Sequence, residues 1–184
     1  MSPDTNIPMH KWLLSVALLF CLTVVAQAQP AMGTAKFGPK WRLLLGDWAG
    51  EGPTGAASGN CSFRLELGEH IIARTNHAEL PASGARQAAA HDDFMVIYPG
   101  SAEDQARAMY WDNEGHVIEY SASWAPDRNT LTFVSKAGPG PQFRLIYKKV
   151  DADTLTVSFE MAPPGQAAAF KPYTSGRIRR TGKG

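Results

Sequence analysis

Most of the chain beyond residue 28 alternates between hydrophobic and polar residues, and turn-forming residues end each alternating stretch. In the clearest case, Leu155, Val157, Phe159 and Met161 are separated by Thr156, Ser158 and Glu160. A period of two is typical of a β-strand with one buried face. Long stretches with the 3.6-residue period of an amphipathic helix are missing beyond residue 28. The sequence therefore predicts an all-β fold.

Turn residues divide this part of the chain into ten predicted strands. The separators are rich in Gly, Pro, Asn and Asp, as in Asp112-Asn113-Glu114-Gly115 and Gly138-Pro139-Gly140-Pro141. A short helical turn is predicted over 39–45. The predicted strands are 47–52, 60–67, 70–79, 91–98, 106–112, 116–125, 130–135, 142–149, 154–161 and 168–180.

Short connections between consecutive strands favour an antiparallel meander. An open sheet of this size would leave two exposed edges, and closure into a barrel removes them. The alternative is a two-sheet sandwich, which usually needs long Greek-key crossovers. No predicted loop exceeds about a dozen residues. We therefore expect an antiparallel up-and-down β-barrel of about ten strands, with a short N-terminal helical turn.

The N-terminus has the order of a secretory signal peptide. Lys11 precedes an apolar run over 12–25, and the small-x-small pattern Ala26-Gln27-Ala28 follows it. The run is shorter than the roughly 20 residues of a membrane-spanning helix, which argues against the alternative of an uncleaved anchor. We expect residues 1–28 to be a cleaved signal peptide and 29–184 a single barrel domain. The protein is then periplasmic or secreted, with no integral membrane span after cleavage.

Net charge and cysteine content limit the binding partners and the covalent cross-links that this chain can have. A formal net charge of +1 gives no electrostatic reason to bind nucleic acid or an acidic membrane. After cleavage only Cys61 remains, so no internal disulfide is expected and stability must come from a hydrophobic core. We expect Cys61 to be buried and inert. The alternative is a thiol that joins two chains.

Gly46-Asp47-Trp48 comes just after the predicted helical turn and opens the first strand. This placement resembles the G-x-W motif of lipocalins. The resemblance implies that Trp48 packs at the closed end of a barrel, beneath an Arg of the last strand. Arg177, Arg179 and Arg180 are the candidates for that Arg. The longer run Gly46–Gly52 resembles the start of nitrobindin-type haem barrels and of a family of uncharacterised bacterial lipocalin-like (calycin) domains.

Two departures from nitrobindins bear on the cofactor. The Tyr-Pro that follows the glycines in nitrobindins is absent here. The nitrobindin haem ligand is a His near the C-terminus, whereas this chain has no His after His116. We therefore expect no haem and no other cofactor.

A meander places alternate loops at the same end of a barrel. The end opposite Trp48 receives the longer loops together with several His and carboxylate residues. Three histidines with carboxylates at one rim could bind a divalent metal. The alternative is that they are ordinary polar residues at strand ends. The candidate ligand-binding residues are His77, His91, Asp93, Tyr110, Asp112, His116 and Tyr120.

No enzyme motif accompanies these residues. The chain lacks G-x-S-x-G, H-E-x-x-H, a P-loop and a dinucleotide fingerprint. Adjacent Asp92 and Asp93 should point to opposite faces of a strand, so they are not a facing acid/base pair. We expect a non-enzymatic barrel that binds a small apolar or amphipathic ligand. The alternatives are a metal-dependent enzyme that uses the His/Asp rim and a structural or interaction barrel filled by its own side chains. Neither a particular ligand nor an oligomeric state follows from the pattern.

Overall fold

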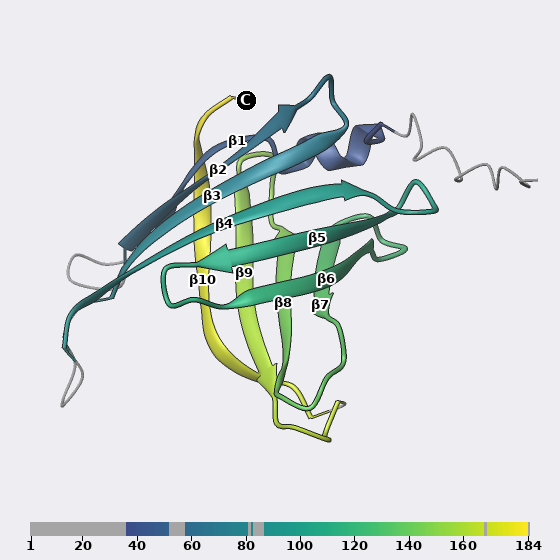
Figure 1. Ribbon diagram of the computed structural model, residues 1–184. Helices are drawn as coiled ribbons and strands as arrows, with labels where there is room; N and C mark the ends of the chain where they lie inside the picture. The colour runs from purple at the N-terminus through teal and green to yellow at the C-terminus, as the bar shows by residue number, and fades with distance from the viewer. Residues whose placement is uncertain (1–35, 52–57, 81, 83–86, 168, 184) are drawn as a thin grey trace, which may run out of the picture. The chain divides into compact units, whose positions relative to one another are not determined.

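Ten strands close into a barrel in which every strand pairs antiparallel with its neighbours in sequence. The computed structural model describes residues 36–51, 58–80, 82, 87–167 and 169–183. β1 pairs with β10 and so completes the ring (Figure 1). The fold confirms the predicted all-β up-and-down barrel. The predicted signal peptide lies outside the described residues.

Among the described residues, a 3-10 helix precedes the strands. Its bounds are Pro39–Leu43 (η1). The strands are β1 (Gly46–Glu51), β2 (Ser58–Glu66), β3 (Ile71–Leu80), β4 (Ala89–Pro99), β5 (Gln105–Asp112), β6 (Val117–Trp124), β7 (Thr130–Ser135), β8 (Gln142–Lys149), β9 (Thr154–Ala162) and β10 (Lys171–Gly182).

The largest differences from the predicted bounds are at the ends of β2, β4 and β10. β4 begins at Ala89, because its pairing with β3 continues to Leu80. β10 begins at Lys171 rather than at residue 168. A turn holds the chain just before it, since the Ala169 amide donates to the Gln166 carbonyl over 2.8 Å.

The two ends of the barrel differ in character. We call the end where β1 begins the Trp48 end, and the opposite end the His91 end. At the Trp48 end, η1 places Trp41 and Leu44 in the core, where both are fully buried. The Trp41 ring packs edge-on against Trp124, with ring centroids 5.8 Å apart. This end of the barrel is therefore closed by aromatic packing.

Trp48 lies beneath an Arg of the last strand, as the lipocalin resemblance implies. The Arg180 Cζ lies 4.2 Å from the centroid of the Trp48 ring. The same guanidinium donates to the Leu43 carbonyl over 3.0 Å and to the Leu45 carbonyl. The Trp48 Nε1 donates to the Leu44 carbonyl over 2.8 Å. These bonds connect η1, β1 and β10 where the barrel closes.

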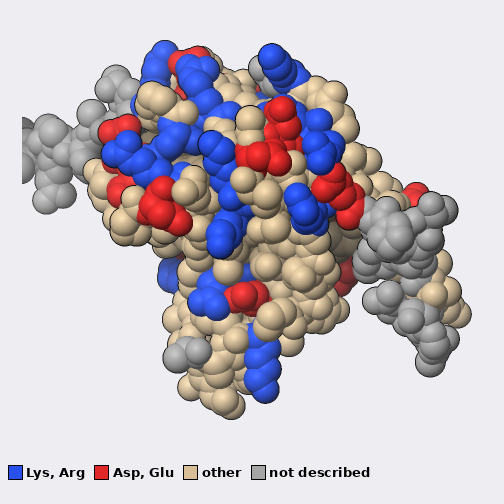
Figure 2. Space-filling model, turned by 180° about the vertical axis from the view of Figure 1, so that it is seen from behind, with Lys and Arg blue, Asp and Glu red and all other residues tan. Residues whose placement is uncertain are grey.

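The outer surface mixes charges of both signs. On the outside of β10, Arg177 and Arg179 both lie beside Glu51 of β1. Lys and Arg side chains adjoin Asp and Glu side chains across the face drawn in Figure 2. Within the described residues, no helix is long and apolar enough to cross a membrane.

Candidate functional site

A buried ion pair lies inside the barrel, above the aromatic layer of the Trp48 end. Arg74 of β3 donates through Nη1 to Asp93 Oδ1 of β4. Their side chains are only 7% and 4% exposed. The pairing of Arg74 with Met95, and of Asn76 with Asp93, places these side chains on the inner face of two adjacent strands. A charged pair this deeply buried is stable only when further hydrogen bonds satisfy it.

Four more side chains extend the network from Asp93. Asn76 Nδ2 donates to Asp93 Oδ2 over 2.9 Å. His91 Nε2 lies 3.4 Å from the same oxygen and 3.0 Å from the Tyr110 hydroxyl. The other ring nitrogen of His91, Nδ1, lies 3.2 Å from Glu114 Oε1. His91 therefore connects β4, β5 and the turn after β5.

Asp112 ends the network at the turn between β5 and β6. Its Oδ1 accepts from the amides of Glu114 and His116, over 3.0 Å and 2.9 Å. Its Oδ2 lies 2.9 Å from His116 Nδ1 and 3.2 Å from the Tyr110 hydroxyl, which donates to it. Burial alone would raise the pKa of this carboxyl, but the bonds from His116 and Tyr110 hold it below its usual value.

Deeper in the barrel, the tyrosines stay uncharged and one of them lies close to Arg74. Burial raises the pKa of both Tyr120 and Tyr147. The Tyr120 ring packs edge-on against Tyr110, with centroids 6.2 Å apart. The Tyr147 hydroxyl is buried close to the Arg74 guanidinium, whose charge opposes part of the rise in its pKa, and neither it nor Arg74 Nε makes a well-formed hydrogen bond. A buried polar pair, Arg74 and Tyr147, therefore lies below the network.

The structure brings together most of the residues predicted from the sequence. His91, Asp93, Tyr110 and Asp112 form the network inside the barrel. Tyr120 packs beneath Tyr110, as described above. His116 contacts Asp112 from the rim, where its side chain is exposed.

His77 does not join the network. It pairs with Asp92, whereas His91 pairs with Ala78, so the two histidines lie on opposite faces of the sheet. His77 Nδ1 lies 2.7 Å from Asp92 Oδ1 on the outside of the barrel. The described residues contain no group of three His, Cys, Asp or Glu side chains placed to hold a metal ion. The rim thus forms His–carboxylate pairs rather than one convergent site.

Arg74 and Asn76 were not among the residues predicted from the sequence. An arginine is usually solvent-exposed, and residues 71–80 show no clean alternation that would assign it to an inner face. A signal was present, because Ile72, Arg74 and Asn76 share one face at a period of two. Ile72 is fully buried, which fixes that face as the inner one.

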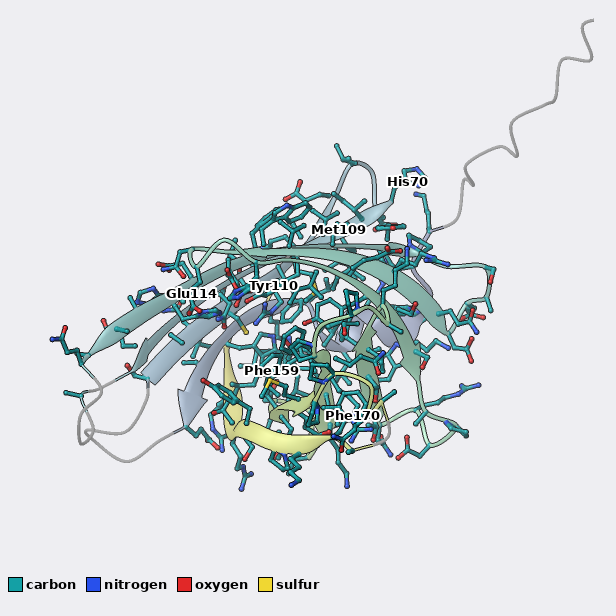
Figure 3. All side chains as sticks on the ribbon, turned by 60° about the horizontal axis from the view of Figure 1, so that its bottom comes forward. His70, Met109, Tyr110, Glu114, Phe159 and Phe170 are labelled. Atoms are coloured by element: carbon teal, nitrogen blue, oxygen red, sulfur yellow. The ribbon has the colours of Figure 1, made fainter. Side chains whose placement is uncertain are left out.

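The wall opposite the network is apolar. Phe143 of β8 and Phe159 of β9 stack with ring centroids 5.7 Å apart, and Tyr173 of β10 packs edge-on against Phe159 at 6.0 Å. In Figure 3, Tyr110 and Phe159 lie inside the barrel on facing walls. In the circular strand order, β5 and β9 are four strands apart. The interior is therefore polar on one side and aromatic on the other.

Glycine leaves open space beside the aromatic wall. Gly176 of β10 pairs with Val157, a residue packed against the core, so it belongs to the inner face of the barrel. A Cβ added at Gly176 would meet nothing within 4 Å. Residues 171–177 of β10 are all exposed, whichever face they belong to. Solvent therefore reaches the inner side of β10 near the His91 end.

Comparison with known proteins supports the fold. The barrel is similar to the crystal structure of Rv2717c from M. tuberculosis, with a TM-score of 0.55 and 15% sequence identity. The match covers 79% of this chain and 99% of that chain. No protein-family model matches the sequence, and no curated protein matches it. The similarity therefore identifies the architecture and not an activity.

Proposed function

We propose that this protein is a lipocalin-like binding barrel that holds a small amphipathic ligand between its two inner walls. The observation that carries the proposal is the facing pair of walls. The Arg74–Asp93–His91–Tyr110–Asp112 network lies on β3–β5, and the Phe143–Phe159 stack lies on β8 and β9. Small-molecule sites typically combine an apolar lining with a few precisely placed polar groups.

Three further features support the proposal. A barrel of this strand number leaves more interior space than the roughly eight-stranded barrels that side chains fill. Exposed β10 residues and the open space at Gly176 provide an entry at the His91 end. The G-x-W motif and its Arg partner are those of lipocalin-like barrels, and the signal-peptide pattern is consistent with a periplasmic or secreted binding protein.

Binding of an uncharged fluorescent probe, N-phenyl-1-naphthylamine, tests the proposal. Its fluorescence should rise on addition of the protein, and the titration should saturate. Phe159→Ala should weaken binding about tenfold or more, because an inner-wall aromatic contact worth about 1.5–3 kcal/mol is lost.

Phe94→Ala is the matched control. Phe94 also pairs with an aromatic ring, Trp111, but both are on the outer face and about 40% exposed. The control should bind the probe as the wild type does. If the wild type shows no saturable binding, or if Phe94→Ala weakens it as much as Phe159→Ala does, ligand binding inside the barrel is disproved. The first of these results would favour a barrel filled by its own side chains.

A further inference from the structure

The charges of the polar network on β3–β5 restrict which charge the polar end of a ligand can carry. Three carboxylates belong to the network, those of Asp93, Asp112 and Glu114. Arg74 is the only Lys or Arg among the buried described residues, and it pairs with Asp93. Asp112 and Glu114 each have a histidine beside them. Even with both histidines protonated, this cluster carries no net positive charge. A ligand carboxylate would therefore enter without a cation to pair with.

The two buried carboxylates are also fully hydrogen-bonded within the protein. Asp93 accepts from Arg74 and Asn76, and His91 lies beside its second oxygen. Asp112 receives two backbone amides, the Tyr110 hydroxyl and the His116 ring. An ammonium group would have to displace these donors to make its own bonds. Breaking buried charge-assisted bonds costs more than replacing bonds to water.

Unused polar atoms remain for a group that both donates and accepts. The Tyr147 hydroxyl and Arg74 Nε are buried close to each other without a well-formed hydrogen bond, and the Arg74 side chain is more than nine-tenths buried on the inner face. His91 and Tyr110 lie nearer the rim, and both are only partly buried. An alcohol can accept from an N–H and donate to an oxygen, and it brings no charge into the barrel.

From this geometry we infer that the barrel selects ligands whose polar end is an uncharged hydroxyl, and that it discriminates against both carboxylates and ammonium groups of the same chain length. The inference rests on the proposed function, because it assigns the chemistry of that same site. Ligands of this class are long-chain or polycyclic alcohols, not fatty acids or alkylamines.

Lys171 is the cation that could act against this selectivity. It begins β10 at the His91 end, where it pairs with Met161 of β9, two residues after Phe159. Its side chain is exposed, and β10 is four strands from β4 in the circular strand order. A carboxylate bound at Lys171 would therefore lie across the barrel from the polar network.

Competition at pH 7 against N-phenyl-1-naphthylamine tests the inference with dodecan-1-ol, dodecanoate and dodecylammonium. Dodecan-1-ol should displace the probe with an affinity about tenfold or more above that of either charged ligand. Equal affinities, or tighter binding of dodecanoate or dodecylammonium, would overturn the inference while the probe titration still supports ligand binding. Absence of any probe binding would overturn the proposed function and, with it, the inference.

Variants locate the origin of the selectivity. Asp112→Asn removes one buried negative charge, so it should reduce the preference for dodecan-1-ol over dodecanoate several-fold. Asp92→Asn is the matched control, because Asp92 lies on the outer face, and its selectivity should equal that of the wild type. Lys171→Met should leave the order of affinities unchanged. An unaltered preference in a folded Asp112→Asn variant would contradict the inference. If that variant does not fold, the affinities of the wild type for dodecan-1-ol, dodecanoate and dodecylammonium test the inference by themselves.

Discussion

The guanidinium of Arg180 covers the indole of Trp48, and each of the two side chains also donates a hydrogen bond to a carbonyl in the segment 43–45 that leads into β1. One contact thus joins the first strand, the last strand and η1. Trp48 is 1% exposed, so removal of its ring leaves a cavity at the closure of the barrel.

We expect Trp48→Ala to lower the free energy of unfolding by about 3–5 kcal/mol, as for other buried aromatic side chains. Chemical denaturation measures the change. Trp111→Ala is the control, because this Trp lies on the outer face and is 40% exposed, and its effect should be much smaller. A loss below about 1 kcal/mol for Trp48→Ala would show that Trp48 does not have the lipocalin-type role.

A second prediction about stability concerns the Arg74–Asp93 pair. Arg74→Met or Asp93→Leu alone should destabilise the fold by about 3–5 kcal/mol, since each leaves one buried charge unpaired. The double variant should be more stable than either single variant, because it removes both charges. Asp92→Asn, at the neighbouring outer position, should change stability by about 0.5 kcal/mol or less. Additive losses in the double variant would show that the two charges are not coupled.

Asp112 makes stability depend on pH in the acid range. Its pKa is lower in the folded protein than its ordinary value, so the unfolded chain takes up the proton more readily. This contribution to stability is present above about pH 4 and is lost as the pH falls through the folded-state pKa. Denaturation at a series of pH values should therefore show a shallower acid loss for Asp112→Asn than for the wild type. Parallel curves would contradict this assignment.

Cys61 should not react in the folded protein. Burial raises the pKa of its thiol to about 11, so almost no thiolate is present near pH 8. Iodoacetamide labelling followed by peptide mass spectrometry should find Cys61 unmodified under native conditions and modified in denaturant. Rapid native labelling, or a disulfide that joins two chains through Cys61, would contradict the buried position.

Export is a prediction from the sequence alone. Full-length protein produced with a C-terminal tag should appear outside the cytoplasm, shortened by about 28 residues at the Ala26-Gln27-Ala28 pattern. N-terminal sequencing of the tagged product identifies the cleavage site. Recovery of the uncleaved chain from the cytoplasm would disprove this prediction.

Local sequence determined the strands of this protein and their order around the barrel. Alternation in segments such as 154–161 and turn residues such as those at 112–115 act over a few residues, so the pattern alone defines each strand to within about two or three residues. The short connections between consecutive strands also predicted that the sheet closes into a barrel. The lipocalin resemblance placed Trp48 under an Arg, but it left three candidates from which the structure selects Arg180.

Only the tertiary structure decided which side chains share the interior. His91 faces inward and His77 outward because of the register between β3 and β4, and a shift by one residue would place both histidines on the same face. The burial of Arg74 depends on a partner, Asp93, that is 19 residues away along the chain. A residue pattern describes the faces of one strand, whereas register and pairing across strands place two charges in the same low-dielectric interior.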